Sequence, residues 1–282
     1  MTDAVMVDSL LRRVARRLTN VGVIPAERES AWLIEAADGR RWQDIILEGQ
    51  VAPEATCRAL SLAHRRAEGE PLQYLTGVAG FRRLELNVGP GVFIPRPETE
   101  LVVDQALAHL SRTGVAVDVG TGSGAIALAI ADERPDARVL ATESSAAALK
   151  WARANRDALS LAVDFYHCDL LSGLPEDLRG RVDVVVSNPP YIASQEANAL
   201  PPEVLEHEPH EALFAGARGT RSLRRIARLA RSWLRPGGWL VLEIGASQDE
   251  LAGALLDENG YVDRSVHTDY NGRARIAVGR WR

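Results

Sequence analysis

Short apolar runs alternate with helical segments from residue 115 onward, and this alternation constrains the fold more than any other feature of the chain. Strands that are joined by helices pair in parallel, and the connecting helices cover both faces of the sheet. The sequence therefore predicts an α/β fold with a parallel, doubly wound, Rossmann-like sheet. The expected strands are 115–119, 139–142, 162–167, 182–186, 239–244, 261–267 and 275–278, and the expected helices are 125–131, 146–158, 222–234 and 249–259.

The beginning of the chain has a different pattern, because residues 7–67 show helical periodicity without strand signals. Leu10, Val14 and Leu18 recur at helical spacing in the first of four expected helices, and arginines occupy the opposite face. The sequence therefore predicts a small N-terminal helical domain at residues 1–69.

A linker with a β-hairpin is expected at residues 70–95, ahead of the sheet domain at residues 96–282. The apolar residues at positions 81–88 alternate in part, as is typical of a hairpin. Gly-Pro-Gly at residues 89–91 is expected to form the hairpin turn.

A glycine-rich turn follows the first predicted strand. Its five residues are Gly120, Thr121, Gly122, Ser123 and Gly124. Glycines let the backbone approach a ligand closely, and the N–H groups at the start of the next helix favour an anionic group. Taken alone, the turn fits a dinucleotide site nearly as well as another nucleotide-like cofactor. Its G-x-G-x-G spacing nevertheless differs from the G-x-G-x-x-G fingerprint of dinucleotide-binding proteins.

Acidic residues end the next two predicted strands. Glu143 is placed to accept hydrogen bonds from a ribose diol, and Asp169 adds an acceptor where an exocyclic adenine amine can lie. The carboxyl ends of parallel strands meet at one edge of the sheet, where open α/β sheets bind their ligands. We therefore expect these acids to border the same crevice as the glycine turn.

The strand at 182–186 runs into Ser-Asn-Pro-Pro-Tyr, which is the most informative segment of the chain. Pro189 and Pro190 cannot donate to a sheet ladder, so the chain must leave the sheet in a rigid turn. Asn188, exposed carbonyl groups and the ring of Tyr191 together suit a planar group that bears an NH₂. We expect Asn188 Oδ1 and the Pro189 carbonyl to accept its two N–H bonds, with Tyr191 on its plane.

The composition of the chain argues against some classes of function. The chain has 282 residues and a net charge of −5, so no global cationic field is available to hold a polyanion. Residues 1–8 are too polar for a signal peptide, and no apolar run approaches transmembrane length. We therefore expect a cytoplasmic protein without direct nucleic-acid or membrane contact.

A metal site is not expected. The two cysteines, Cys57 and Cys168, lie far apart without a C-x-x-C motif. His207-Glu-Pro-His-Glu211 lacks the H-E-x-x-H spacing, and its proline would interrupt the helix that aligns two histidines.

Several segments together resemble the HemK family of release-factor glutamine methyltransferases. They are the glycine turn after Asp118, Asn188-Pro-Pro-Tyr191, Gln73-Tyr74, Phe93-Ile-Pro-Arg-Pro-Glu-Thr-Glu100, Glu208-Pro-x-x-Ala-Leu213 and Pro236-Gly-Gly-x-Leu-x-Leu-Glu-Ile-Gly245. The resemblance covers the chain from about residue 70 onward, and residues 1–66 match only as helices.

The resemblance implies a class I methyltransferase that uses S-adenosylmethionine. Its substrate would be the side-chain amide of the glutamine in the Gly-Gly-Gln motif of class I peptide chain release factors. By position, the glycine turn would hold the methionine part of the cofactor, Glu143 its ribose, and Asp169 with Leu170 its adenine. Arg96, with residues 188–191, would contact the substrate. Two positions depart from the family pattern: Glu143 stands where aspartate is usual, and Gly219-Thr220 where relatives often carry Asp-Gly.

Two other functions stay open at this point. An adenine-N6 methyltransferase would use the same turn to hold an adenine amine, but it needs base flipping and a cationic groove. A non-catalytic translation factor would keep the fold only as a docking surface. The intact Asn188, Tyr191 and glycine turn argue against this alternative, because a docking surface does not need them.

Overall fold

The computed structural model describes residues 4–282, and by their contacts these residues form two units. The first, which we call the helical unit, comprises the described residues up to Val78 together with Val88–Pro90 and Pro201–His207. The second, the sheet unit, comprises Ala79–Asn87, Gly91–Leu200 and Glu208–Arg282. The domain limits expected from the sequence, 1–69, 70–95 and 96–282, stay a prediction.

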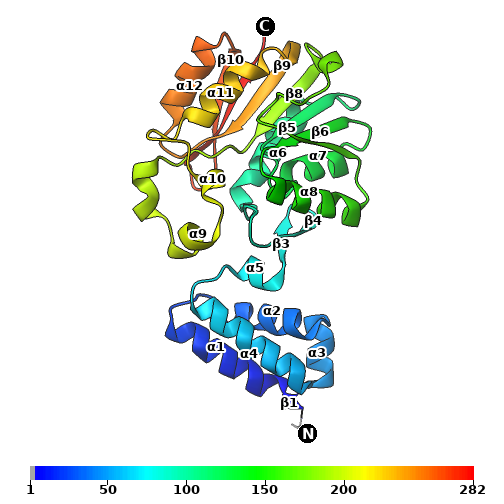
Figure 1. Cartoon of the computed structure of the whole chain (residues 1–282), viewed down its shortest axis with the longest axis vertical. Helices are drawn as coiled ribbons and strands as arrows, with labels where there is room; N and C mark the ends of the chain where they lie inside the picture. The colour runs from blue at the N-terminus through cyan, green and yellow to red at the C-terminus, as the bar shows by residue number, and fades with distance from the viewer. Residues whose placement is uncertain (1–3) are drawn as a thin grey trace. The chain divides into compact units, whose positions relative to one another are not determined.

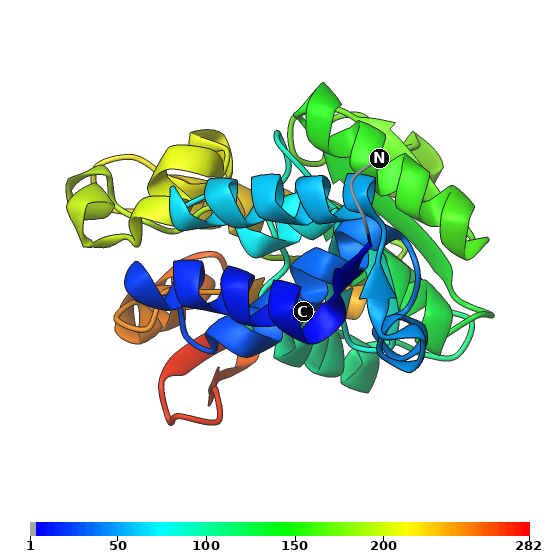
Figure 2. The same ribbon diagram turned by 90° about the horizontal axis from the view of Figure 1, so that it is seen from below.

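The helical unit is built around the apolar face of its first helix, as the spacing of Leu10, Val14 and Leu18 predicts. These side chains are buried against Leu33 and Ile34 of the second helix, and α1 packs beside both α2 and α4 (Figure 2). The elements of this unit are β1 (Val5–Met6), α1 (Val7–Asn20), α2 (Ala26–Asp38), α3 (Trp42–Glu48), β2 (Gln50–Val51), α4 (Pro53–Ala67), α5 (Leu72–Thr76) and α9 (Pro202–His207).

A buried arginine explains why residues 201–207 belong to the helical unit. Arg66 of α4 donates from Nε to Glu29 of α2 at 2.7 Å and from Nη1 to Glu203 of α9 at 2.8 Å. The Arg66 side chain is only 11% exposed, so its charge needs these carboxylate partners. One guanidinium thus joins segments that lie 37 and 137 residues away in the sequence.

The sheet unit contains a seven-stranded sheet with the order β10-β11-β9-β8-β5-β6-β7 (Figure 1). Strands β5 (Val115–Val119), β6 (Arg138–Glu143), β7 (Val163–His167), β8 (Val182–Ser187) and β9 (Leu234–Glu243) pair in parallel. The remaining elements are β3 (Val78–Phe81), β4 (Leu84–Asn87), η1 (Pro97–Thr99), α6 (Glu100–His109), α7 (Ala125–Glu133), α8 (Ala146–Leu159), η2 (Glu176–Leu178), η3 (Ser194–Ala199), α10 (His210–Leu213), α11 (Arg221–Ala230), α12 (Asp249–Glu258), β10 (Val262–Thr268) and β11 (Ala274–Arg280).

The α/β class with a doubly wound, mostly parallel sheet is confirmed, but two details expected from the sequence are wrong. The sheet is not wholly parallel, because β11 pairs antiparallel with both β9 and β10. A short turn joins β10 to β11, and a hairpin connection forces its two strands to run in opposite directions. The hairpin of β3 and β4 turns at Arg82 and Arg83 rather than at residues 89–91, which follow β4.

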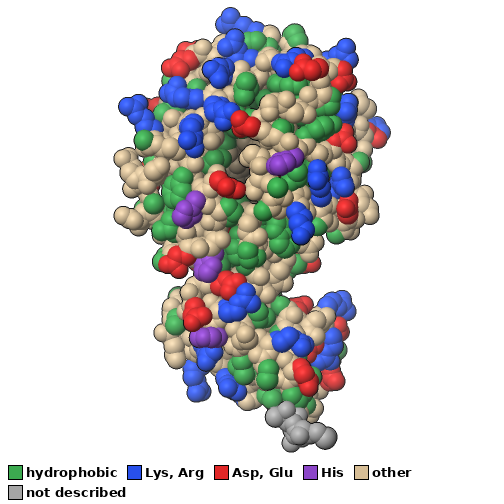
Figure 3. Space-filling model, viewed as in Figure 1, with side chains coloured by type: hydrophobic (Ala, Val, Ile, Leu, Met, Phe, Trp, Pro, Cys, Tyr) green, Lys and Arg blue, Asp and Glu red, His purple; other side chains and the backbone are tan. Residues whose placement is uncertain are grey.

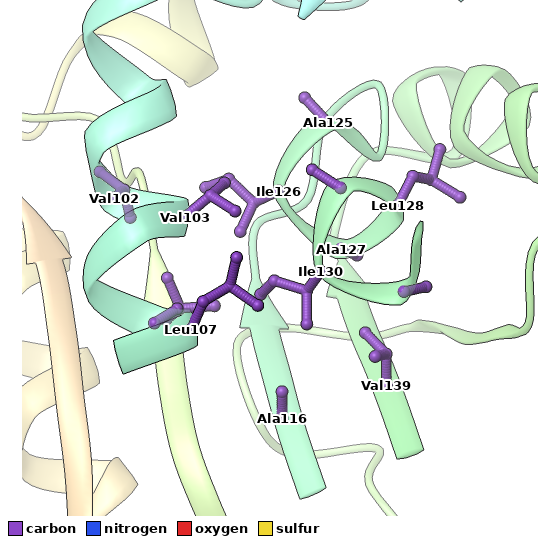
Figure 4. Close-up of a cluster of buried hydrophobic side chains, with 14 of the residues drawn as sticks. Val102, Val103, Leu107, Ala116, Ala125, Ile126, Ala127, Leu128, Ile130 and Val139 are labelled. Atoms are coloured by element: carbon purple, nitrogen blue, oxygen red, sulfur yellow. The ribbon is translucent and has the colours of Figure 1, made fainter. Parts of the chain in front are cut away.

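Alternate residues of each central strand enter two separate cores, one on each face of the sheet. In β5, Ala116 packs with α6 and α7, whereas Val117 and Val119 pack with α11 and α12. On the first face, Val103 and Leu107 of α6 lie opposite Ile126 and Ile130 of α7 (Figure 4). The two covered faces leave only the strand ends of the central sheet available to a ligand.

No helix within residues 4–282 combines the length and the apolarity that a membrane crossing requires.

The packing on the first face of the sheet gives a stability prediction. Ile130 is 0% exposed, so Ile130→Ala should leave a cavity and lower the free energy of unfolding of the sheet unit by about 2–5 kcal/mol. Tyr270→Ala is the matched control, because Tyr270 is 94% exposed in the same unit. Urea-dependent hydrogen exchange at β5 and β6 measures the effect. Equal losses in the two variants would contradict this description of the core.

Candidate active site

Four polar segments end four neighbouring strands, as the sequence predicts. The glycine turn follows β5, Glu143 ends β6, Asp169 lies two residues beyond β7, and Asn188 follows β8 directly. The order β8-β5-β6-β7 makes these strands consecutive in the sheet. The segments therefore share the carboxyl edge where open α/β sheets bind ligands.

The glycine turn is fixed to the neighbouring strand by its main chain. Gly120 N and Thr121 N both donate to the Thr142 carbonyl of β6, at 2.9 and 3.0 Å. Gly122 has a φ of 58°, and a Cβ added there would meet no atom within 4 Å. The backbone at Gly122 therefore borders open space and has a conformation that L side chains rarely adopt. Ser123 accepts from Asn155 of α8 at 3.0 Å, which holds the far end of the turn.

Glu143 joins the glycine turn to the start of α8. Its Oε2 accepts from Gly122 N and its Oε1 accepts from Ser145 N, both at 2.9 Å. One carboxylate thus contacts both main-chain groups. Each carboxylate oxygen accepts more than one hydrogen bond, so Glu143 keeps acceptor capacity for a diol.

Asp118 lies beneath the glycine turn and is almost fully buried. Its Oδ2 accepts from the Thr121 hydroxyl at 2.6 Å and from Ala127 N at 3.2 Å, whereas its buried Oδ1 has no hydrogen-bond partner among the described residues. Burial raises the pKa of Asp118 to about 7, with the Glu143 charge acting in the same direction and the two hydrogen bonds opposing it. An orphaned carboxylate oxygen at this position suits a cationic partner.

The residues after β7 include an acid whose partner the sequence did not indicate. Asp169 is exposed, and its carboxylate accepts from both terminal nitrogens of Arg225 in α11, at 3.3 and 2.5 Å. Leu170 has a φ of 51° and packs against the core on the α11 face. The role of Asp169 and Leu170 beside an adenine stays a prediction, and Arg225 is a competitor for the Asp169 carboxylate.

The Asn188–Tyr191 turn is held from behind by hydrogen bonds at both ends. The Ser187 hydroxyl donates to the Val119 carbonyl at 2.6 Å, and Gln248 Nε2 donates to the Tyr191 carbonyl at 3.0 Å. Asn188 Nδ2 donates to the Thr99 hydroxyl at 3.0 Å. Pro189 is buried, and Pro190 is partly exposed between the two held ends.

The Tyr191 hydroxyl contacts a buried acid. It donates to Glu243 Oε1 at 3.4 Å, and burial, followed by the Glu243 charge, raises the pKa of the Tyr191 phenol above its ordinary value. The ring therefore stays neutral and anchored at its hydroxyl end.

Arg96 is paired rather than free to meet an anion. It forms an ion pair with Glu208, which is only 4% exposed and also accepts from Ile94 N at 3.2 Å. The guanidinium lies over the Phe93 ring, 4.8 Å from its centroid. These contacts tie the segment before α6 to the segment before α10. A direct contact between Arg96 and substrate stays a prediction.

No role was assigned from the sequence to four residues that support the Asn188–Tyr191 turn: Thr99, Gly219, Glu243 and Gln248. At Gly219 an added Cβ would lie 2.2 Å from the Tyr191 carbonyl oxygen, so only glycine fits beside the turn. Glu243 had a visible signal, because it is an acid within an otherwise apolar strand pattern. Among residues 4–282, no group of three or more His, Cys, Asp or Glu side chains is arranged to hold a metal ion.

Comparisons with known proteins agree with this arrangement. Residues 9–77 match the model of the PrmC N-terminal domain, and residues 89–218 match that of the methyltransferase small domain. A release factor glutamine methyltransferase from Streptomyces coelicolor is 42% identical over 96% of this chain and 98% of its own length. One from Mycolicibacterium smegmatis is 46% identical over 80% of each chain.

Two solved structures share the fold at low identity. A T. thermophilus 16S rRNA methyltransferase in complex with AdoMet and guanosine has a TM-score of 0.52 and 21% identity, covering 73% of this chain and 50% of that one. The hMettl16 catalytic domain has a TM-score of 0.53 and 18% identity, covering 84% and 86%.

The mixed sheet with antiparallel β11, and the glycine turn at the end of β5, define a class I methyltransferase. The identity to the curated relatives is specific enough to go further. The chain belongs to the release factor glutamine methyltransferase family.

The buried state of Asp118 gives a pH prediction. Its pKa is raised on folding, so between about pH 4 and pH 7 the unfolded state is ionised while the folded state keeps its proton. Stability should therefore fall as the pH rises through this range, by up to about 1.4 kcal/mol per pH unit for this one group. Asp118→Asn should make the slope shallower. Urea unfolding of both proteins from pH 4 to 8 measures it, and parallel curves would show that Asp118 is ionised in the folded state.

Proposed function

We propose that the chain transfers a methyl group from S-adenosylmethionine to the side-chain amide nitrogen of the glutamine in the Gly-Gly-Gln motif of class I peptide chain release factors. The observation that carries the proposal is the Asn188–Tyr191 turn at the end of β8, adjacent in the sheet to the glycine turn of β5. Membership of the release factor glutamine methyltransferase family supports it independently.

The residues at the strand ends fit the cofactor. Gly122 leaves open space beside the glycine turn, as the close approach of a ligand to the main chain requires. The unpartnered Asp118 Oδ1 suits the ammonium group of the methionine part, and Glu143 suits the ribose diol. When bound, S-adenosylmethionine supplies a sulfonium-activated methyl group.

The Asn188–Tyr191 turn fits the substrate amide. An amide nitrogen is a poor nucleophile because its lone pair is delocalised into the carbonyl group. Asn188 Oδ1 and the Pro189 carbonyl accept its two N–H bonds, which fixes the nitrogen in one orientation and favours pyramidalisation as the new bond forms. Tyr191, anchored through Glu243, supplies a neutral flat ring beside the amide plane. The proton leaves the nitrogen after methyl transfer.

An adenine-N6 methyltransferase is the alternative that the same turn allows, and it is less well supported. The net charge is −5, and acidic and basic side chains are mixed on the face of the sheet unit that is in view in Figure 3. A flipped-base enzyme needs a cationic groove to hold the nucleic-acid backbone. The non-catalytic alternative predicts no methyl transfer at all.

We also propose that the helical unit is the docking element for the release factor. Its match to the PrmC N-terminal domain over residues 9–77 supports this role. Its apolar core, which includes Leu10, Val14 and Leu18, is separate from the two cores of the sheet unit and supports a distinct role for this unit. We propose the cytoplasm as the site of the reaction, because its substrate is a translation factor.

The glycine turn gives the cofactor prediction. Gly122→Val should weaken S-adenosylmethionine binding by about a hundredfold or more, because a branched side chain would fill the open space and disfavour the required φ. Gly180→Val is the matched control, since Gly180 has a φ of 67° and open surroundings but precedes the amino end of β8, not the carboxyl end of a strand. Isothermal calorimetry measures both. Normal affinity in Gly122→Val would remove the glycine turn from the cofactor site.

Asn188 gives the test of the proposed activity. Single-turnover transfer of labelled methyl should occur with purified release factor, but not with its Gly-Gly-Ala variant or with duplex DNA. Asn188→Ala should keep cofactor affinity within a few fold and slow transfer by about a hundredfold or more, because one well-placed acceptor is lost.

Asn198→Ala, an exposed asparagine in η3, serves as the control and should transfer at the wild-type rate. Transfer to DNA instead of release factor would favour the adenine alternative. A rate in Asn188→Ala within a few fold of wild type would leave Asn188 as a turn former only.

A further inference from the structure

A chain of hydrogen bonds connects Asn188 to a buried carboxylate that the proposed chemistry does not use. Asn188 Nδ2 donates to Thr99 Oγ1 at 3.0 Å, and Thr99 Oγ1 donates to Glu243 Oε2 at 2.7 Å. Thr99 is 3% exposed and Glu243 is 2% exposed. Thr99 comes from η1, just before α6, and Glu243 ends β9, which is the neighbour of β8. Three separate segments therefore meet behind the proposed nucleophile site.

These hydrogen bonds all run in one direction, from Asn188 to Thr99 to Glu243, because each residue has a limited set of donors. An ionised carboxylate only accepts, so the single hydroxyl hydrogen of Thr99 is committed to Glu243. Thr99 Oγ1 can then only accept from Asn188, which must present its NH₂ group. The opposite corner of the amide, Oδ1, is left to face the other way as an acceptor.

The direction matters because the two corners of an asparagine amide have nearly the same shape and opposite hydrogen-bonding roles. A reversed Asn188 would turn its own NH₂ group toward the NH₂ group of a substrate amide. Two donors that face each other cannot hold the nitrogen for methyl transfer. Ser187 and Gln248 hold the main chain of the turn, but neither bonds to the Asn188 side chain.

We propose that Thr99 and Glu243 are positioning residues, which orient the Asn188 amide so that its oxygen, not its nitrogen, faces the substrate. This inference rests on the proposed methyl transfer to a side-chain amide. It requires Glu243 to be ionised in the active enzyme, because a protonated Glu243 can donate to Thr99 and reverse the direction of the hydrogen bonds.

The surroundings of Glu243 place its titration in an accessible pH range. Burial raises its pKa to about 7, and Glu98 acts in the same direction. The hydrogen bonds from Thr99 and Tyr191 and the positive charge of Arg275 oppose this effect. Arg275 in β11 also forms an ion pair with Asp269 at 3.1 Å.

The test compares two substitutions at Thr99 under single-turnover conditions with release factor and saturating S-adenosylmethionine. Thr99→Val keeps the shape but removes the hydroxyl, and should slow transfer by about tenfold to a hundredfold through loss of orientation. Thr99→Ser keeps the hydroxyl and should stay within a few fold of wild type. Both should bind S-adenosylmethionine and release factor with nearly wild-type affinity.

The pH profile distinguishes positioning from a purely structural role. The transfer rate of wild type and of Thr99→Ser should rise with pH through about 7, as Glu243 becomes ionised. Thr99→Val breaks this series of hydrogen bonds, so the rise should be lost or much smaller than in wild type. A rise of the wild-type size in Thr99→Val would contradict the positioning role.

Equal rates in Thr99→Val and Thr99→Ser would overturn the positioning role while leaving the methyl transfer intact. A wild-type rate that is flat between about pH 6 and 8 would do the same without any variant, even if Thr99→Val fails to fold. Absence of methyl transfer by the wild-type protein itself would overturn the proposed function, and the positioning role with it.

Discussion

The parallel pairing of β8 between β5 and β9 is the constraint on which the rest of the site depends. β8 is buried along its whole length, so its register with both neighbours is fixed by packing on two faces of the sheet. This register sets the height at which Pro189 and Pro190 end the strand. It also places Asn188 beside the glycine turn on one side and beside Glu243 on the other.

Two buried carboxylates, Asp118 and Glu243, flank this central strand at the ends of β5 and β9. Both are held mainly by neutral donors, a threonine hydroxyl in each case, and burial raises the pKa of each to about 7. Burying an acid without a cation in direct contact destabilises the fold. The two acids therefore lower stability at the same edge where ligand chemistry needs fixed acceptors, as is common at functional sites.

Other buried charges in the molecule form ion pairs that join separate segments. Arg66 with Glu29 and Glu203 joins three segments of the helical unit, and Arg96 with Glu208 joins two segments of the sheet unit. In both clusters the acid or the base is nearly buried and its opposite charge is in contact. Arg66 thereby ties three helices together, and Arg96 ties the segment before α6 to the segment before α10. A direct contact between Arg96 and substrate stays a prediction.

The sequence by itself determined which segments become strands and helices and where the ligand edge lies. Apolar runs, the glycine turn and Pro189-Pro190 act locally, so the strand ends at Glu143 and Asn188 were predictable from their immediate neighbours. Only the tertiary structure decided the partners of the polar side chains. Asn188 meets Thr99 across 89 residues, Thr99 meets Glu243 across 144, and Asp169 meets Arg225 across 56. Such pairings depend on which polar groups the packed chain brings together from distant parts of the sequence, and no local pattern encodes that choice.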